Sequence, residues 1–507
     1  MSCSYSGLIT SARDAPGEVD DSRARRYAAH PFRSQPVAAG PLDVTPVLIG
    51  ILAYVALQLV VGLLVSRNIR SEADYLVAGR RLGYPLAVFS IFATWFGAET
   101  CIGAAGGVHA EGLKSTVQDP FGYAICVLAM GVFFAAPLWR RRLITLADLF
   151  RERYSRGVER VACILMIPTS ILWAAAQLRA FGQVLAHNAD GLSIPAAVAI
   201  ATGVTLLYTV VGGMLADAWT DLLQGSLLMI GLVILLVLLL KNADAVAALR
   251  AIPEERLSFR DPGESVLSFM NRWAIPIVGS VMAQELIARV SAARSAVVAR
   301  RSALLAGVIY LGFGLIPVLV GLIGPQLVPD LEDPEQILPA VAALHMSTFV
   351  YVLFVGVLVS AILSTVDSAL LVAGSLLSHN LVVPLLPELG ERGRLRAARS
   401  GVLLFGLIAF VLALTSDGVL ELVEEASGFG SQGIFVIAVF GLFSRFGGRA
   451  SAYAALLLGI SVWVLAHFVL ELPCDYLLAL GAALAGYLAA ARIGRSPVVR
   501  RSRATSA

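Results

Sequence analysis

A ten-residue stretch, Val359–Ser368, carries many oxygen-bearing side chains inside an apolar segment that is long enough to cross a bilayer as a helix. Four of its residues recur at helical spacing, so they share one face of that helix. Hydroxyl and carbonyl oxygens are the ligands that small hard cations prefer. The pattern therefore predicts a cation site inside the membrane. The four residues are Ala361, Ser364, Thr365 and Ser368.

Asp367 adds an ionisable group to the same segment. Charge is costly at this depth, so an intramembrane acid is a hypothesis of function by default. The alternative is that the small Ser and Thr residues only allow close helix packing and bond back to carbonyls one turn earlier. The density of polar groups favours ion binding, because Ser360 brings the number of polar side chains in ten residues to five.

The composition indicates a helical membrane protein with many spans. The chain has 507 residues, of which 58% are hydrophobic and 14% are charged. Its apolar runs are continuous and not alternating, which favours transmembrane helices over a β-barrel. The net charge of +3 comes with arginines in short loops, and we expect no nucleic-acid partner. The five cysteines are scattered and form neither a disulfide framework nor a metal-binding pattern.

We expect an all-α fold with about thirteen transmembrane helices. Residues 1–41 are predicted to be a disordered polar leader, 42–495 a transporter domain and 496–507 a basic cytoplasmic tail. The predicted spans are 44–65, 83–109, 118–139, 161–187, 193–211, 214–240, 273–291, 303–323, 349–377, 398–416, 426–444, 450–471 and 474–492.

Arginine-rich loops follow the odd-numbered spans, for example at Arg140–Arg142 and Arg392–Arg399, whereas the opposite loops are acidic or neutral. By the positive-inside rule, the C-terminus is cytoplasmic and the N-terminus lies outside, in the plasma or inner membrane. This orientation places the arginines of the leader outside, which the rule does not favour.

Two predicted spans carry helix-breaking residues. The span 83–109 contains Gly97, Gly103, Gly106 and Gly107, and 273–291 contains Pro276 and Gly279. They are the second and the seventh of the predicted spans. The chain therefore divides into two halves of five spans, at about 83–240 and 273–444, and each half begins with a broken helix. This layout is typical of an inverted-repeat transporter with a site near the midplane. The alternative is that the glycines serve helix packing.

The segment 214–240 adds a second set of polar residues on one helix face, with two acids one turn apart. Asp217 is expected near the membrane surface, where it meets only water. Asp221 lies deeper and is the better cation ligand.

Three stretches together resemble the sodium:solute symporter family: YTVVGGMLADAWTDLLQ at 208–224, VSAILSTVDSALLVAGSLLSHNL at 359–381 and WRRRLITLADLFRERYS at 139–155. The resemblance implies thirteen helices with a five-plus-five inverted-repeat core. It also implies a main sodium site formed by the carbonyls of Ala93, Phe96 and Ala361 and the hydroxyls of Ser364 and Thr365. A second sodium site would use Asp221, Ser364, Ser368 and Asp367.

Within that family, the stretches ATWFGAE at 93–99 and QDPFGYA at 118–124 look like the high-affinity choline transporter branch, and the proline symporter branch is also similar. Choline transporters hold a quaternary ammonium among aromatic rings, of which one tryptophan matches Trp95 and another lies near Trp173. The sequence departs from the branch at Ala283, where a tryptophan is expected.

Several polar and aromatic residues near the predicted helix breaks are candidates for contact with a solute. Carboxylates with tryptophans suggest an amine or ammonium group, as in an amino acid or a betaine-like solute. The alternatives are that the tryptophans only pack, that Glu99 pairs with Arg179 or Arg289, and that Asp119 is an acid at a helix N-terminus. The substrate candidates are Trp95, Glu99, Thr100, Gln118, Asp119, Trp173 and Gln284, with Glu285 beside them.

We therefore expect a symporter that imports a small organic solute with Na⁺ by alternating access, with no obligate protein partner. No enzyme motif is present. One alternative is proton coupling on the same scaffold, through Asp221, Glu99 or Asp367. A second is a transporter-like membrane sensor, which would carry a fused signalling domain.

Overall fold

A computed structural model describes residues 71–187, 192–386, 388–416 and 419–493, with isolated positions between 49 and 69. Within these residues the elements are helical, apart from one isolated bridge between Leu82 and Ala293. Nine of the described helices, or ten if one bent pair is a single span, are long and apolar enough to cross a membrane. The predicted leader and tail lie outside the described residues, and so does most of the predicted first span.

The first half of the described chain contains the first interrupted span and the long helices that pack beside it. α4 contacts α10 and α14, and α9 contacts α10. The helices, with short 3₁₀ or π segments written η, are α3 Glu72–Val77, η1 Ala78–Arg80, α4 Tyr84–Trp95, η2 Glu99–Ala104, α5 Ala105–Glu111, η3 Gly112–Val117, η4 Gln118–Gly122, α6 Tyr123–Ala129, η5 Met130–Phe134, α7 Ala135–Arg140, α8 Leu146–Arg153, α9 Arg156–His187, α10 Ile194–Lys241 and α11 Ala243–Arg250.

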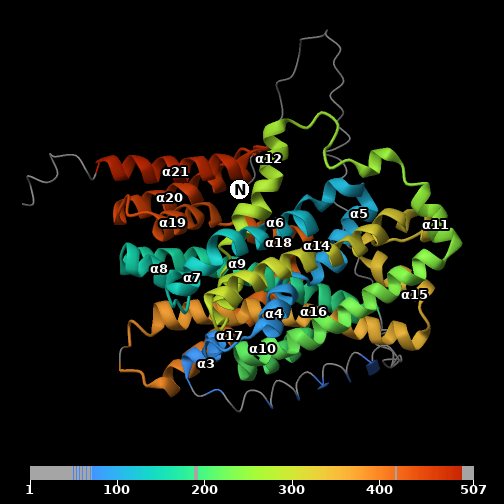
Figure 1. Cartoon of the computed structure of the whole chain (residues 1–507), viewed down its shortest axis with the longest axis horizontal. Helices are drawn as coiled ribbons and strands as arrows, with labels where there is room; N and C mark the ends of the chain where they lie inside the picture. Colours follow the sequence, from blue (N-terminus) through green and yellow to red (C-terminus); the bar gives the residue numbers. More distant parts are fainter. Residues whose placement is uncertain are drawn as a thin grey trace, which may run out of the picture. The chain divides into compact units, whose positions relative to one another are not determined.

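The second half contains the other interrupted span and α16, which carries the hydroxyl-rich stretch. α16 packs against α9, α10 and α17. Figure 1 shows the last three helices side by side, at the red end of the colour scale. The elements are η6 Glu254–Leu257, α12 Val266–Ala274, η7 Ile275–Gly279, α13 Gln284–Ala292, α14 Ala296–Leu327, η8 Pro334–Gln336, α15 Ile337–His345, α16 Thr348–Ser375, η9 Leu376–Val382, α17 Glu391–Thr415, α18 Val419–Gly428, α19 Ser431–Phe443, α20 Arg449–Val464, η10 Leu465–Val469 and α21 Asp475–Ile493.

Both spans with predicted helix breakers are interrupted in the structure. α4 ends at Trp95 and the helix resumes at Glu99, while η7 ends at Gly279 and α13 begins at Gln284. Gly97 lies in the first gap, where an added Cβ would come within 2.7 Å of the Thr365 hydroxyl oxygen. A side chain at this position would therefore crowd the side-chain oxygens of Thr365, Gln177 and Glu99. The gaps leave backbone groups free for other partners.

The long helix α10 is broken at Gly213, between the predicted spans 193–211 and 214–240. Its φ of 62° lies in the left-handed region that favours glycine. An added Cβ would lie 2.6 Å from the Tyr75 ring, so close packing also requires glycine. The break separates the part of α10 that carries the two acids from the part before it.

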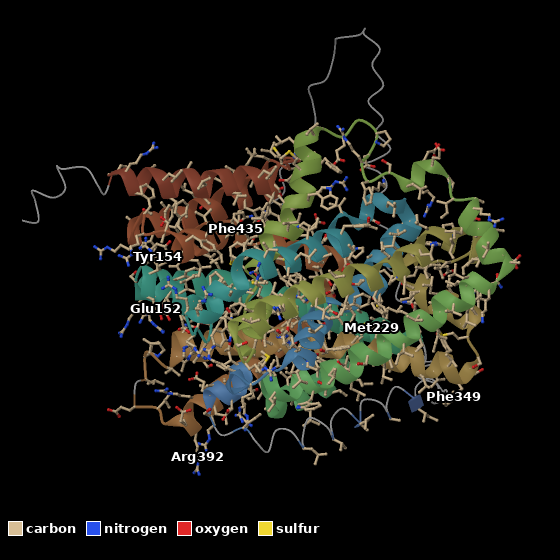
Figure 2. The ribbon with its side chains drawn as sticks, viewed as in Figure 1. Glu152, Tyr154, Met229, Phe349, Arg392 and Phe435 are labelled. Carbon is tan, nitrogen blue, oxygen red and sulfur yellow. The ribbon has the colours of Figure 1, made fainter. Side chains whose placement is uncertain are left out.

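The arginine-rich loops meet at one end of the helices. Arg80 donates to the carbonyl of Ser291 at 2.9 Å and to that of Leu143 at 2.8 Å, which joins the loops after three predicted spans. Figure 2 shows Glu152 and Arg392 at the same end of the helices. These contacts agree with the grouping of the loops that the sequence predicts.

Candidate functional site

The hydroxyl-rich face of α16 lies against the break that follows α4. The Thr365 hydroxyl lies 3.3 Å from the carbonyl oxygen of Ala93 and 3.3 Å from that of Ala361. Phe96 caps α4 at the start of the gap, with non-helical φ and ψ. The structure therefore brings backbone and hydroxyl oxygens from two separate helices together in a buried place.

Asp221 of α10 lies beside this group and is fully buried. It accepts a hydrogen bond from the Ser90 hydroxyl at 2.7 Å and another from the Ser364 hydroxyl. Sequence reasoning missed Ser90. Its signal was the polar pair of Ser90 and Thr94, four residues apart in an apolar helix, where Thr94 donates to the Ser90 carbonyl at 2.6 Å.

Asp217 differs from what the sequence predicts. It is not at a wet surface: it is 1% exposed and forms an ion pair with Arg289 of α13 at 2.5 Å. Ser368 donates to Asp217 at 3.1 Å and also contacts the Arg289 guanidinium. Ser368, expected beside Asp221, therefore belongs to the Asp217–Arg289 pair in this structure.

Asp367 is buried on α16, but no hydrogen bond links it to Asp221 or Ser364 among the described residues. It follows Ser364 by three positions, which places it on the opposite side of Ser364 from Thr365. Asp367 therefore lies nearly opposite Thr365, the residue that meets α4, and its side chain is next to Thr209 of α10. Its Oδ1 has no hydrogen-bond partner among the described residues.

A small pocket next to the break contains residues that were predicted for the ion and for the solute. Trp95 and Trp173 meet in it, with ring centroids 5.3 Å apart. The ring of Tyr123, which was not predicted, lies 4.9 Å from that of Trp95. The pocket is lined by Thr94, Trp95, Trp173, Ala283, Glu285 and Thr365.

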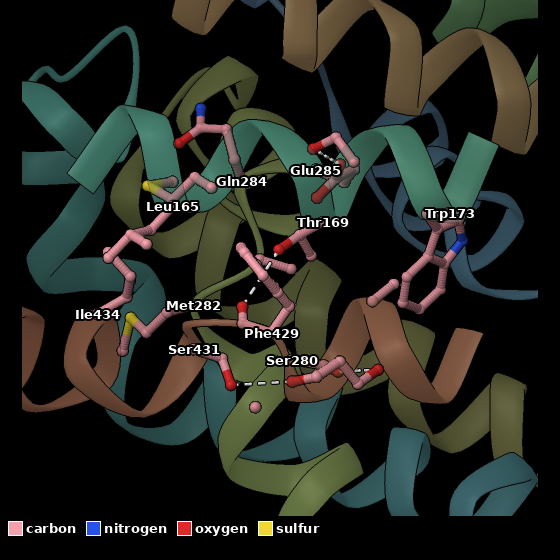
Figure 3. Close-up of a pocket in the computed structure, with 16 residues that line it drawn as sticks. Leu165, Thr169, Trp173, Ser280, Met282, Gln284, Glu285, Phe429, Ser431 and Ile434 are labelled. Carbon is pink, nitrogen blue, oxygen red and sulfur yellow. Dashed lines mark hydrogen bonds between the residues drawn. The ribbon is translucent and has the colours of Figure 1, made fainter. Parts of the chain in front are cut away.

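A larger pocket adjoins the small one through Trp173, Ala283 and Glu285, which line both. It lies at the second helix break, between α9, α13 and the bent pair α18–α19 (Figure 3). Ser170 donates to the Glu285 carboxylate at 2.6 Å, and Ser280 donates to Ser427 at 3.2 Å. Its walls combine aromatic and aliphatic side chains with several hydroxyls and one carboxylate.

Glu99, Thr100 and Asp119 form a separate buried group that lines neither pocket. Thr100 donates to Asp119 at 2.8 Å, and Tyr310 of α14 donates to the same oxygen at 2.9 Å. Gln177 donates to Glu99 at 2.6 Å, and neither arginine considered for Glu99 forms an ion pair with it among the described residues. One oxygen of each acid lacks a partner among these residues.

The two predicted glutamines are already bonded to the protein. Gln118 donates to the Tyr123 hydroxyl at 3.1 Å. The Gln284 carbonyl accepts from the backbone N–H of Leu146 at 2.6 Å, although Gln284 also lines the larger pocket. Gln284 therefore joins α13 to the start of α8, whereas the hydrogen bond of Gln118 is local.

The profile of the sodium:solute symporter family matches residues 75–459, which is most of the chain. The chain belongs to this family. Membership makes it a multi-pass membrane transporter and not an enzyme, and implies that sodium is transported with a small solute.

Among curated relatives of this symporter is a high-affinity choline transporter of Drosophila melanogaster, which is 26% identical over 73% of this chain and 62% of its own length. A sodium/proline symporter of Haemophilus influenzae is 25% identical over 82% of this chain and 86% of its own length. The alignment with the choline transporter thus spans less than two thirds of that relative.

The symporter also shares its fold with a solved Na⁺-coupled sialic acid symporter in a substrate-bound outward-open state. The TM-score is 0.77 at 15% identity, and the match covers 89% of this chain and 98% of the other. At this identity the likeness establishes the fold alone.

Proposed function

We propose that this symporter imports a small organic solute with an amine or ammonium group, such as an amino acid or a betaine-like solute. The observation that carries the proposal is the composition of the small pocket, where Thr365 meets Trp95, Trp173 and Glu285. An ion held by Thr365 and a solute held by the tryptophans would be neighbours. Such proximity is what coupling between two transported species requires.

The main sodium site uses the carbonyls of Ala93, Phe96 and Ala361 with the hydroxyls of Ser364 and Thr365. Support comes from the 3.3 Å contacts that Thr365 makes with the carbonyls of Ala93 and Ala361. Neutral oxygens replace the water around a hard cation, and the nearby Asp221 carboxylate supplies negative charge. Bound sodium therefore stabilises the contact between α4 and α16.

A second sodium would bind nearest to Asp221 and Ser364, which are already hydrogen-bonded to each other. The family resemblance also implies Ser368 and Asp367 as ligands, but neither is hydrogen-bonded to Asp221 among the described residues. The guanidinium of Arg289 already neutralises the acid next to Ser368.

The proposed topology has thirteen spans in a five-plus-five inverted-repeat core, with the first span at 44–65. The N-terminus lies outside and the C-terminus in the cytoplasm. The contacts of Arg80 with the loops at Leu143 and Ser291 support this arrangement, since they join arginine-rich loops at one end. In this orientation sodium enters from outside and is released into the cytoplasm.

Sodium entry supplies the energy for uptake. Each inward charge gains about 2.3 kcal/mol per 100 mV, which supports roughly 50-fold accumulation per ion. Binding of sodium holds the broken helix against α16 and completes the solute pocket. Release of sodium into the cytoplasm loosens both.

A second candidate is proton coupling, which the Glu99 and Asp119 group favours. Both acids are fully buried, and each has an oxygen without a partner among the described residues. Two neighbouring buried carboxylates are unfavourable unless one is protonated or a cation binds. This pair is thus a place where a transported proton would reside.

Uptake by purified protein in liposomes tests the proposal. We expect a sodium gradient, and not a pH gradient, to drive accumulation of a radiolabelled solute from a panel of amino acids, betaine-like solutes and sugars. Amines and zwitterions are expected to compete for uptake. Inhibition by neutral sugars alone would contradict the proposed substrate class, and uptake driven only by a pH gradient would favour the second candidate.

A further inference from the structure

Glu285 is the one ionisable residue in the lining of the two adjoining pockets. It is 8% exposed, and no Lys, Arg or His side chain forms an ion pair with it among the described residues. The nearest basic residue on its helix, Arg289, gives its guanidinium to Asp217 and Ser368 and contacts only the backbone carbonyl of Glu285. If this carboxylate is ionised, a cation in the pocket would offset the cost of burying its charge.

The position of this carboxylate is fixed by its neighbours. Ser170 of α9 donates to one oxygen of Glu285 at 2.6 Å. Figure 3 shows Glu285 against α9, on the same wall of the pocket as Trp173. Glu285 also lies in the first turn of α13, directly after the non-helical residues Met282 and Ala283.

The aromatic rings of the site pack against one another instead of surrounding a space. The ring centroids of Trp95, Trp173 and Tyr123 lie 4.9, 5.3 and 5.8 Å apart. A cation–π contact places the cation within about 6 Å of a ring centroid, so rings that enclose a bulky cation must stand farther apart than these. Ala283 also leaves the wall at the second helix break without a ring.

We infer that Glu285 is the counter-ion of the transported solute, and that the pocket selects a protonated amine with N–H groups over a quaternary ammonium. A carboxylate gains its strongest contact from charge-assisted N–H hydrogen bonds, which a quaternary nitrogen cannot donate. The indole N–H of Trp95 also lacks a partner among the described residues, which leaves a donor free for a polar group on the solute. The inference rests on the proposed function and narrows its substrate class.

The test uses four amines in which each added N-methyl group replaces one N–H: ethanolamine, N-methylethanolamine, N,N-dimethylethanolamine and choline. Sodium-dependent currents from proteoliposomes give the half-saturating concentration of each. We expect this concentration to rise with every added methyl group. In Glu285→Gln, the value for ethanolamine should rise roughly 10- to 100-fold, the loss expected for a charged hydrogen bond, and the four values should converge.

Three further variants separate recognition from folding. Glu332→Gln removes one acid at an exposed position outside the pockets and should change nothing. Glu285→Asp keeps the charge and should keep the order of the four amines. Ser170→Ala removes the hydrogen bond that positions the carboxylate and should weaken ethanolamine binding about fivefold, so the inference stays testable if Glu285→Gln does not fold.

Choline as the best of the four, or an unchanged order in Glu285→Gln, would overturn this inference while leaving the proposed function in place. Binding of ²²Na⁺ to the purified protein reports on the ion site separately. Intact ²²Na⁺ binding without a response to any of the four amines would also overturn the inference, whereas loss of sodium dependence altogether would instead contradict the proposed coupling.

Discussion

Asp217 and Asp221 lie one turn apart on α10, and both are buried, yet their surroundings differ. Asp217 forms an ion pair with Arg289 at 2.5 Å. Asp221 accepts hydrogen bonds from the hydroxyls of Ser90 and Ser364 and forms no ion pair among the described residues. An aspartate therefore pairs with a charged arginine at position 217, whereas the aspartate at position 221 accepts hydrogen bonds only from neutral hydroxyls.

The difference separates a structural acid from one that is available to a transported ion. A buried charge is tolerated when a partner offsets the cost of removing it from water. Asp217 has such a partner in Arg289, which joins α10 to α13. Asp221 has no such partner among the described residues, so in the proposed mechanism a cation beside it would supply the missing charge. We expect variants at the two positions to fail in different ways.

The largest effect is expected from Arg289→Met, which leaves Asp217 buried without its partner. Breaking a buried pair in this way costs about 3–5 kcal/mol. The purified protein should therefore be scarce and should unfold at a lower temperature in detergent. The double variant Asp217→Asn with Arg289→Met removes both charges and should recover most of the yield. Normal yield of the single variant would show that the pair is not structural.

Asp221→Asn should weaken sodium binding and leave the stability of the fold unchanged. The carboxylate no longer faces the ion, and we expect the half-saturating sodium concentration to rise at least tenfold, which corresponds to about 1.4 kcal/mol. Asp244→Asn, at an exposed acid of α11, controls for the loss of one charge. Sodium-dependent uptake at several sodium concentrations measures the shift. An unchanged sodium dependence, with normal uptake, would exclude Asp221 from the ion site.

The sequence was sufficient for features that depend on spacing along one helix. Helical periodicity placed Ala361, Ser364 and Thr365 on one face, and glycine content located the break at Gly97. Both follow from the geometry of a single segment and from the cost of glycine within a helix. The structure has these residues side by side, with Thr365 3.3 Å from the Ala93 carbonyl.

Partners from distant segments were beyond sequence reasoning. The sequence does not say which helix faces which, so the pairing of Asp217 with Arg289, 72 positions away, was not predicted. For the same reason Ser368 was assigned to Asp221, and Glu99, Thr100 and Asp119 were placed with the tryptophans. Spacing identifies a face of a helix, whereas packing between helices decides what that face meets.

Removing single hydroxyls beside Asp221 tests which of them contacts sodium. Ser364→Ala removes both a donor to Asp221 and a proposed ligand of sodium, and Ser90→Ala removes only a donor. A lost hydrogen bond is worth about 1 kcal/mol, so Ser364→Ala should weaken sodium binding roughly fivefold. Ser90→Ala should have a smaller effect. Equal effects in ²²Na⁺ binding would indicate that the Ser364 hydroxyl does not contact the ion.

The smallest effect is expected at Ser368, one turn after Ser364 on the same face of α16. Its hydroxyl donates to Asp217 and contacts Arg289, so Ser368→Ala removes a contact from the pair that is already neutral. Sodium affinity should change by less than about threefold, because the Asp217–Arg289 pair remains intact. A shift as large as that of Ser364→Ala would mean that the ion lies between the two acids. The contrast between Asp217 and Asp221 would then be lost in the sodium-bound protein.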